Sequence, residues 1–547
     1  MESSGGRPFG LRSGGEDRSQ IPFPNPGHDM AHIVLINPKF EASFWGLEYA
    51  MPMFGKRANL PVACLPLLAA LTPSGHTITL MDECVEPLDF DLIARADIVG
   101  LTGMIVQRAR MREILTELKR REVFTVVGGA WVSVEEEYFG DLADVIFVGE
   151  AEETWPRFLS EWQQGRHQHR YEQDERTDMT RVPTPRFDLL KMKHYLFGSL
   201  QFSRGCPFQC EFCDIIVTFG RKPRLKTSAQ IVAELEAMRQ QGTFAVFIVD
   251  DNLIGNKKAI KELLRELVAW QEANGYPFIF FTEASLDLAE DEELMQLMAD
   301  ANITSVFVGI ESPNEAALRE TKKFQNIRGG STILERVHKI QKAGLEVWCG
   351  MIVGFDQDDS TVFTNQIEFV QKARISSAVV GMLYAIPKTP LHARLAKAGR
   401  LDPADFPEYG TNVIPMQVGR EELREGYRRV YEELYAPKAY FDRIEELFLT
   451  NKIAQCQAQA RHDGRHPWTG VKRWLGYAGR AAGLFARLLW KVEDASLRRE
   501  YRRRMVRFLR RRPDPTYLLL FALKCAMHYH FYSLSQEMRE GRIRNSF

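Results

Sequence analysis

Three cysteines, Cys206, Cys210 and Cys213, lie close together in the stretch QFSRGCPFQCEFCDIIV. Their spacing is C-x3-C-x2-C, and no fourth cysteine lies nearby, because the next one in the chain is Cys349. Three thiolates can hold three irons of a four-iron cubane and leave the fourth iron without a protein ligand. Since an open iron can bind a substrate, the pattern predicts a reactive iron–sulfur site. The alternative is a zinc knuckle, but that site normally takes four ligands and would need a distant partner here.

The cysteine spacing, with the aromatic Phe212 directly before the last cysteine, resembles that of the radical S-adenosylmethionine (SAM) enzymes. In that superfamily the open iron chelates the amino and carboxylate groups of SAM. One electron then cleaves the sulfonium and gives a 5′-deoxyadenosyl radical. The resemblance implies a [4Fe-4S] cluster on the three cysteines, SAM as a cofactor, and Phe212 near the adenine. We predict no catalytic residue beyond the cluster ligands.

Polar residues end three hydrophobic runs that follow the cysteine loop. Because the carboxyl ends of barrel strands carry functional residues, we expect these side chains to surround one site. In the superfamily an acid after the second strand takes the SAM amino group, and a polar residue from a middle strand holds the ribose. By this resemblance the candidate SAM-binding residues are Asp250, Asp251 and Asn252, in VDDN where the superfamily usually has Gly-Gly-Glu; Glu283, preferred for the ribose, with Ser285; and Glu311.

A structural interpretation of the same acids stays open. Any one of them could belong to a buried ion-pair network with Lys257, Lys258 or Lys388. For the whole set this is the weaker interpretation, because all of the acids are expected at one end of the same barrel.

The elements that would position these residues alternate between strand-like and helix-like patterns. Six hydrophobic runs alternate with amphipathic segments, which predicts six βα units with the cysteine loop directly after the first strand. This order matches the partial (β/α)6 barrel of radical SAM enzymes. The predicted strands are 199–205, 244–251, 278–285, 305–312, 346–355 and 378–387, and the predicted helices are 228–241, 257–273, 290–301, 329–343, 359–373 and 390–398.

A first alternating series precedes the barrel and predicts a parallel, doubly wound sheet. Three of its strands end in glycine, and ligands of open α/β sheets bind beyond the carboxyl ends of strands. The alternative is that these glycines only make tight turns. The predicted strands are 33–38, 77–82, 97–103, 125–129 and 144–149, and the clearest helices are 105–121 and 151–163.

A sheet domain followed by a radical SAM barrel resembles the cobalamin-binding subclass of these enzymes, over nearly all of residues 32–400. The resemblance implies a cobalamin cofactor that contacts GLTG, GGAWVS and VGEAEE. The motif D-x-H-x-x-G is absent, which implies cobalt without a histidine lower ligand. The candidate cobalamin-binding residues are Thr102, Gly103, Gly128, Gly129 and Gly149.

Within residues 194–400 the segments CPFQCEFCDI, VDDNLIGNKK and YAIPKTPLHARLAKAGRL resemble the hopanoid 2-methylases and their near relatives. The resemblance implies transfer of a SAM-derived methyl group, by way of cobalamin and a 5′-deoxyadenosyl radical, to an unactivated carbon of a hydrophobic small molecule such as a hopanoid-type lipid. It also implies an external low-potential electron donor. The segment SFWGLEYAMPMFGKRANLP resembles that branch less and could shape the substrate cavity.

Two other functions stay open. One is a radical SAM cyclase, isomerase or oxidase without methyl transfer. The other is a non-catalytic redox or cofactor sensor, which the complete set of polar strand ends disfavours. A sensor would also carry an effector module, and the sequence suggests none.

Composition sets the frame for these functions. The chain has 547 residues, 45% apolar and 26% charged, which is ordinary for a soluble protein of two or three domains. Scattered cysteines and the absence of a long apolar run favour a cytoplasmic protein without membrane spans. The predicted division is a disordered tail at 1–29, a cobalamin-binding-like domain at 30–165, a linker at 166–195, the radical SAM barrel at 196–400 and a helical C-terminal region at 401–547.

An arginine-rich stretch lies in the C-terminal region. Residues 498–512 hold nine arginines and one glutamate, with Tyr501, Met505, Phe508 and Leu509 between them. The stretch could be a solvated or internally paired helix, or an interfacial helix on anionic lipid at the inner membrane surface. Because some radical SAM methylases modify RNA, nucleic-acid binding is a third interpretation, although a net charge of −1 leads us to expect no nucleic-acid partner.

Overall fold

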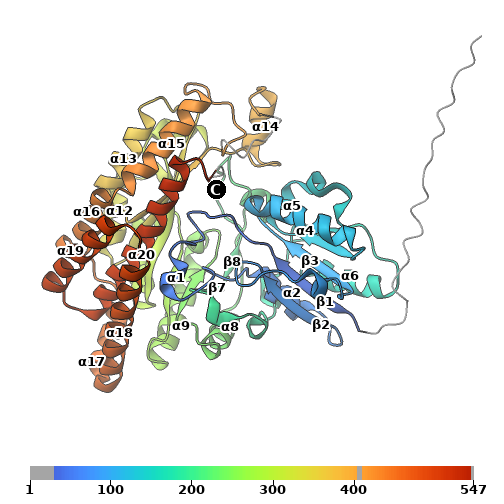
Figure 1. Cartoon of the computed structure of the whole chain (residues 1–547), viewed down its shortest axis with the longest axis horizontal. Coiled ribbons are helices and arrows are strands. Elements are labelled where there is room, and N and C mark those ends of the chain that lie inside the picture. The colour runs from blue at the N-terminus through green and yellow to red at the C-terminus, as the bar shows by residue number, and fades with distance from the viewer. Residues whose placement is uncertain (1–29, 403–409, 544–547) are drawn as a thin grey trace, which may run out of the picture.

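The computed structural model describes residues 30–402 and 410–543, so the predicted tail at 1–29 lies outside the described residues. Figure 1 shows an N-terminal sheet with its helices, a central barrel-like sheet, and a set of C-terminal helices along one side of the barrel. Both large sheets are parallel, and the α/β fold class predicted from the sequence is confirmed.

The first sheet has six parallel strands in the order β2-β1-β3-β4-β5-β6. The order reverses direction between β1 and β3, and such a switch point is where doubly wound sheets bind ligands. Its strands are β1 (His32–Asn37), β2 (Thr77–Asp82), β3 (Ile98–Thr102), β4 (Thr125–Gly128), β5 (Val145–Val148) and β6 (Arg170–Glu172). Its helices are α2 (Cys64–Leu71), α3 (Phe90–Ile93), α4 (Arg108–Arg120), α5 (Ala130–Val134) and α6 (Thr154–Gln163).

Alternating residues of this sheet build two separate apolar layers, one on each face. On β1, Val34 and Ile36 pack into one cluster and Ile33 and Leu35 into the other. Strands buried on both faces read as continuous apolar runs, and this made them recognisable in the sequence. All five strands predicted there are present. The sixth strand, β6, was not predicted, because it is a short edge strand in a polar stretch where only Tyr171 is buried.

The second sheet is the partial barrel, with six parallel strands in the order β7-β10-β11-β12-β13-β14. All six predicted strands and the six predicted helices are present. The strands are β7 (Gly198–Leu200), β10 (Ala245–Ile248), β11 (Ile279–Glu283), β12 (Ile303–Glu311), β13 (Glu346–Val353) and β14 (Ser377–Met382). The helices are α8 (Ser228–Gln240), α9 (Lys257–Ala273), α10 (Glu292–Asp300), α12 (Ile333–Lys342), α13 (Val362–Lys372) and α14 (Pro390–Lys397), with short α7 (Ile215–Thr218) and α11 (Glu315–Glu320) between them.

The first barrel strand is shorter than predicted. It ends at Leu200, and β8 (Ser203–Arg204) then pairs antiparallel with β9 (Arg224–Leu225). The Asp250 carboxylate accepts hydrogen bonds from the backbone amides of Phe202 and Ser203, both at 2.7 Å. These bonds replace ladder bonds and hold the chain that leads to the cysteine loop.

The C-terminal region is helical, as predicted, and covers the last barrel strand. Tyr431 of α15 and Tyr435, directly after the helix, donate hydroxyl hydrogen bonds to the carbonyls of Val380 and Ala378, both at 2.7 Å. The same two hydroxyls accept from the amides of Val380 and Ala378. An edge strand with its backbone groups satisfied in this way is closed to other strands. The helices are α15 (Arg420–Leu434), α16 (Pro437–Glu445), α17 (Gln457–Arg465), α18 (Pro467–Lys491), α19 (Ala495–Arg511) and α20 (Pro515–Arg539).

The segment between β1 and α2 connects the N-terminal sheet with the barrel and the C-terminal helices. Phe44 stacks on Tyr431 at 3.8 Å between ring centroids, and Trp45 lies 4.8 Å from Phe307 of β12. The buried His530 of α20 accepts from the Tyr49 amide and contacts the Ser43 carbonyl. This segment, which includes α1 (Met51–Phe54), therefore lies against the barrel. From the sequence we expected that it could shape the substrate cavity, and that role stays a prediction.

Candidate active site

The three cysteines lie on the loop between β8 and α7, beyond the carboxyl end of the first barrel strand. Gly205 precedes the loop with φ of +96°, and a Cβ there would lie 2.9 Å from the Gly220 carbonyl oxygen. Glycine at this position therefore lets the loop close, and the Cys206 amide donates to that same carbonyl. The three thiols form no disulfide.

Side-chain amides point at two of the sulfur atoms. Gln325 Nε2 donates to Cys210 Sγ at 3.3 Å, and Asn252 Nδ2 lies 3.9 Å from Cys206 Sγ. Hydrogen bonds to the sulfurs stabilise ligating thiolates and tune Fe–S clusters. Burial raises the pKa of the Cys206 and Cys213 thiols, so a bound metal is what would keep them deprotonated at neutral pH. This donor set fits an iron–sulfur cluster.

No three His, Cys, Asp or Glu side chains gather around one point in the part of the chain that the structure describes. The three thiols are thus spaced apart on their loop. In a cubane of this kind each of the three cysteines ligates a different iron, so the ligands do not meet at a single ion.

The two aspartates of VDDN have different surroundings. Both oxygens of the buried Asp250 accept hydrogen bonds, from Phe202 and from the amide and hydroxyl of Ser203, and burial raises its pKa to about 7. Asp251 accepts from the Gly205 amide through one oxygen at 2.7 Å, and burial raises its pKa to about 6. Asp250 therefore holds the strand end, whereas Asp251 holds the start of the cysteine loop and keeps its second oxygen for another donor.

Asn252 and the end of β11 complete this side of the site. Asn252 donates to Ser285 Oγ at 3.1 Å and accepts from the Ser285 amide, so the pair links the Cys206 sulfur to the third strand. Glu283 is half-buried, and its carboxylate makes no hydrogen bond within the described residues. Burial, followed by the charges of Asp251 and Asp250, raises the Glu283 pKa to about 8.

Lys323 is the functional candidate that the sequence did not reveal. Its Nζ lies 2.7 Å from Glu311 Oε1 and 5.8 Å from the centre of the Phe212 ring. Burial acts to lower the Lys323 pKa, but Glu311 and the thiols of Cys210 and Cys213 outweigh it, so the pKa is raised and the group stays cationic. A single lysine in a loop after a short helix has no strand-end pattern to mark it.

Among the candidate acids, only Glu311 pairs with a lysine of the described residues, and that lysine is Lys323 rather than Lys257, Lys258 or Lys388. Lys257 pairs with Asp287 at 2.7 Å, and Lys388 pairs with Glu136 at 2.9 Å. The candidate SAM residues thus surround one end of the barrel, next to the cysteine loop.

A cavity of about 370 Å³ lies at the carboxyl edge of the first sheet. This is the size range of small-molecule sites. Its lining continues onto the barrel through Asp214 and Ile215, which directly follow Cys213. The five residues predicted to contact cobalamin all line it: Thr102, Gly103, Gly128, Gly129 and Gly149. Sequence reasoning missed Cys64 and Gln107, which reach the cavity from α2 and from the short 3-10 helix before α4.

Glycines let the backbone form this cavity. Gly129 has φ of +101°, and a Cβ there would lie 2.5 Å from Thr102 Oγ1, so two loops meet closely only because it is glycine. Gly149 has φ of +74°, and a Cβ there would enter open space. Apolar walls with exposed backbone fit a large, flat macrocycle, and none of the lining residues that the structure describes is a histidine.

Buried ion pairs join the cavity to the cysteine loop. Arg204, two residues before Cys206, lies 2.7 Å from Glu150 and 2.6 Å from Glu152, on the loop after β5. Arg224 of β9 adds a contact to Glu150 at 2.9 Å. The same side chains thus fix the sheet domain and the cluster loop relative to each other.

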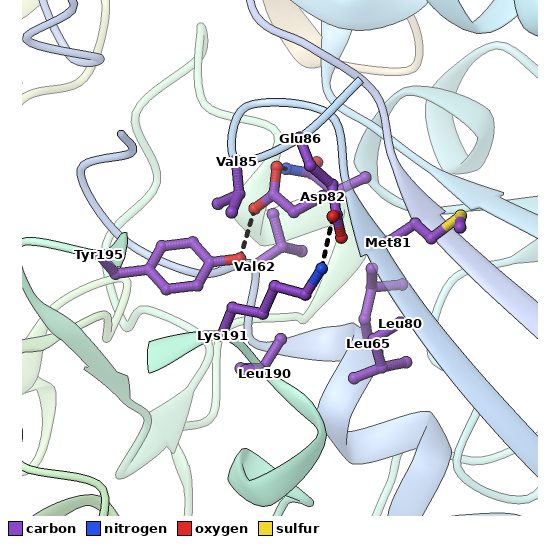
Figure 2. Close-up of a pocket in the computed structure, with 11 residues that line it drawn as sticks. Val62, Leu65, Leu80, Met81, Asp82, Val85, Glu86, Leu190, Lys191 and Tyr195 are labelled. Atoms are coloured by element: carbon purple, nitrogen blue, oxygen red, sulfur yellow. Dashed lines mark hydrogen bonds and ion pairs between the residues drawn. The ribbon is translucent and has the colours of Figure 1, made fainter. Parts of the chain in front are cut away.

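A smaller pocket adjoins the cavity and shares Asn37, Val62 and Leu65 with its lining. Figure 2 shows Tyr195 donating to Asp82 there, at 2.8 Å, and Lys191 paired with Glu86. Asn37 donates to Asp82 and accepts from Gln107. This chain of hydrogen bonds holds the ends of β1 and β2 at the edge of the cavity.

Three stretches of the chain match known families. Residues 200–363 match the radical SAM superfamily and residues 60–159 match the B12 binding domain. Residues 389–544 match a domain of unknown function (DUF4070). The cysteine loop lies within the radical SAM match, and the glycines that line the cavity lie within the B12 binding match, so the cofactors are a [4Fe-4S] cluster, SAM and cobalamin.

Relatives of similar length carry methyltransferase names. An uncharacterized methyltransferase of Synechocystis is 40% identical over 430 residues, which cover 78% of this chain and 80% of that protein. The hopanoid C-2 methylase of Rhodopseudomonas palustris is 31% identical over 526 residues, which cover 95% of this chain and 96% of that protein.

Solved structures share the fold. The cobalamin-dependent SAM radical enzyme OxsB, solved with aqua-cobalamin and SAM bound, matches with a TM-score of 0.58 at 14% identity, covering 95% of this chain and 82% of that one. The methyltransferase TsrM from Kitasatospora setae matches with a TM-score of 0.54 at 18% identity, covering 73% and 85%. The chain is a methyltransferase and belongs to the radical SAM enzymes with a cobalamin-binding domain, in the branch that includes the hopanoid C-2 methylase.

Proposed function

We propose that this chain methylates an unactivated carbon of a hydrophobic small molecule, and that a hopanoid-type lipid is the best candidate substrate. The observation that carries the proposal is the single cavity that reaches from the glycine-rich sheet edge to Asp214 and Ile215, directly after Cys213. A relative that covers 95% of this chain is a hopanoid C-2 methylase, which supports the substrate class.

Each candidate residue receives a role in the proposal. Cys206, Cys210 and Cys213 ligate the cluster. Asp251 accepts a hydrogen bond from the SAM ammonium, whereas Asp250 holds the strand end. Glu283 binds the ribose, and Lys323, kept cationic by Glu311, faces the SAM carboxylate. Asn252 and Ser285 position the Cys206 side of the loop, and Phe212 packs near the adenine. Thr102, Gly103, Gly128, Gly129 and Gly149 contact the corrin through the backbone and the Thr102 hydroxyl.

When bound, the cluster and SAM supply a hydrogen-abstracting radical, and the cobalamin supplies a methyl group. The protein supplies placement and excludes water, because a reactive radical needs a dry site with the target carbon in contact. Half-buried rings suit this purpose. Phe247 stacks on Phe281 at 4.3 Å, and Phe281 also meets Phe197 and Trp348.

These rings lie on the concave side of the barrel sheet. On β12, Val306 and Val308 are fully buried in the helix-side core, whereas Phe307 between them is half-buried and contacts Trp45. Because side chains alternate across a strand, Phe307 points into the barrel. An apolar aromatic wall fits a polycyclic hydrocarbon better than a charged substrate.

The proposed partners follow from the chemistry. An external low-potential donor supplies the electron, and no nucleic acid is needed. A lipid substrate gives a reason for membrane contact through 498–512. Part of that stretch is paired internally, since Arg504 and Arg507 contact Glu445. Other arginines of the stretch are exposed, and no described helix is long and apolar enough to cross a membrane.

A substrate assay tests the proposal. The anaerobically reconstituted protein is given SAM, a reductant and either a detergent-solubilised hopanoid or a polar control such as tryptophan. We expect a hopanoid product that is heavier by one methyl group and no tryptophan product. A Phe281→Ser variant should raise KM for the lipid while SAM affinity stays unchanged. Methylation of the polar control alone would overturn the substrate class.

A further inference from the structure

Helix α18 exposes several large apolar side chains. The exposed fractions are 81% for Trp468, 51% for Val471, 56% for Trp474, 59% for Leu475 and 78% for Trp490. Single exposed apolar residues are common on protein surfaces, but a set of this size on one helix marks an interaction site.

The helix is already anchored to the protein by another face. Ala481, Leu484 and Leu488 are buried, and the helix packs along α20 and against α1. At 100° per residue, Trp468, Val471, Leu475 and Trp490 fall within an arc of about 100° on the outward side, with Trp474 beside it. The helix therefore has two apolar faces, of which the protein covers one.

The charge of α18 points to the kind of partner. Its 25 residues include no Asp or Glu. Arg480, Arg487 and Lys491 are exposed and lie side by side on one flank of the apolar arc. Residues 467–512 hold fourteen Lys and Arg against three Asp and Glu, whereas the whole chain has a net charge of −1. The positive charge is thus concentrated in this part of the sequence, and α18 itself carries five Lys and Arg.

Tryptophan marks both ends of the helix. Trp468 and Trp490 are separated by about 33 Å along the axis, and both point outward, so they can reach one flat surface together. Tryptophan favours the boundary between headgroups and acyl chains. An apolar face with tryptophans and a flank of Lys and Arg is the pattern of a helix that lies in the plane of an anionic bilayer.

We propose that the outward face of α18 docks the protein on an anionic lipid bilayer, with Trp468, Leu475 and Trp490 at the acyl boundary and the flanking cations on the headgroups. The docking element is α18, which precedes the arginine-rich stretch at 498–512 in the chain. This inference does not depend on the proposed substrate.

Vesicle flotation of the purified full chain tests the proposal. Vesicles of phosphatidylcholine with phosphatidylglycerol are compared with vesicles of phosphatidylcholine alone. We expect binding to the anionic vesicles, at least tenfold weaker binding to the neutral ones, and a binding that falls as salt rises. The triple variant Trp468→Ser/Trp474→Ser/Trp490→Ser should lose at least tenfold in partition coefficient.

Two controls keep the test specific. Met416→Ser removes another exposed apolar side chain, which is 65% exposed, and should change binding less than twofold. Arg480→Gln/Arg487→Gln/Lys491→Gln should weaken binding to anionic vesicles only. The substituted side chains are exposed, so thermal unfolding should match the parent protein.

Two outcomes would overturn the proposal. One is unchanged vesicle binding by the tryptophan variant. The other is no vesicle binding together with a dimer that the tryptophan variant breaks, which would assign α18 to a second copy of the chain. Formation of 5′-deoxyadenosine needs no membrane, so a failed flotation leaves the methylase proposal standing.

Discussion

Two regions that face the cofactors are built in different ways. At the cluster end of the barrel, polar side chains hold one another: Asp250 fixes Ser203, and Asn252 bridges Cys206 and Ser285. At the edge of the first sheet, by contrast, glycines bring backbone to the surface of an open cavity. In the function that we propose, the first region binds its cofactor through specific groups, and the second provides a cavity of the right shape.

The difference has a direct consequence for substitution. Removing one group from the cluster end takes away a ligand or leaves a buried partner unsatisfied, which is costly. Removing one side chain from the glycine-rich edge should change less, because the backbone of the glycines forms much of that edge and many apolar side chains share the rest. Only added bulk should damage that region. Substitutions of the two kinds should therefore separate the two cofactors.

The largest effect is expected from the cysteine ligands. Cys206→Ala, Cys210→Ala or Cys213→Ala should abolish 5′-deoxyadenosine formation, because a cluster without one thiolate cannot present its open iron correctly. Iron content and product analysis by mass spectrometry measure this. Cys456→Ala is the matched control and should keep both. An active ligand variant would contradict the assignment of the cluster.

Added bulk at Gly149 should break the second region alone. Gly149→Leu places a side chain in the cavity and should raise the Kd for cobalamin by at least about tenfold, or about 1.4 kcal/mol. Gly165 also has a positive φ and open space around it but lies outside the cavity. Gly165→Leu therefore shares the left-handed backbone penalty of about 1–2 kcal/mol without the loss of cobalamin. If the Kd for cobalamin rose equally in both variants, backbone strain rather than the filled cavity would be responsible.

Arg204 joins the two regions, so its removal should affect both. Arg204→Met leaves the Glu152 carboxylate buried without its partner and should cost about 3–5 kcal/mol of unfolding free energy. Arg170→Met breaks an exposed pair with Glu136 and should cost about 0–1 kcal/mol. Chemical denaturation of the two variants compares them. If the two variants lost similar amounts of unfolding free energy, the ion pairs of Arg204 with Glu150 and Glu152 would contribute no more to stability than an exposed pair.

Among the substitutions at the cluster end of the barrel, Lys323→Met should have the smallest effect. Lys323→Met should weaken SAM binding about tenfold to a hundredfold, because a hydrogen bond to a charged group is worth about 1.5–3 kcal/mol. The cluster should stay in place, as its visible absorbance would report. Lys322→Met, on the exposed neighbour, should bind SAM normally. Loss of the cluster itself in the Lys323 variant would give this residue a structural role instead.

Patterns in the sequence were sufficient for the main strands and for gathering the candidate residues at one end of the barrel. They could not show which of two adjacent acids faces the cofactor. Asp250 and Asp251 are consecutive, so their side chains point to different sides, and only the fold shows that Asp250 is used by the backbone. Two of the residues that were missed, Lys323 and Cys64, lie in segments for which no strand or helix was predicted. Gln107 lies at the start of the predicted helix 105–121, but helical periodicity does not show which polar side chain reaches a ligand site. For the same reason, apolar periodicity in α18 could not tell which face another helix covers.

The central claim is that both cofactor sites serve one methyl transfer. Product stoichiometry in a reaction with SAM that carries a deuterated methyl group tests it most directly. We predict S-adenosylhomocysteine, 5′-deoxyadenosine and a lipid with a trideuterated methyl group in equal amounts. If 5′-deoxyadenosine formed without S-adenosylhomocysteine and without labelled lipid, the chain would be a radical SAM cyclase, isomerase or oxidase, and the claim would be wrong.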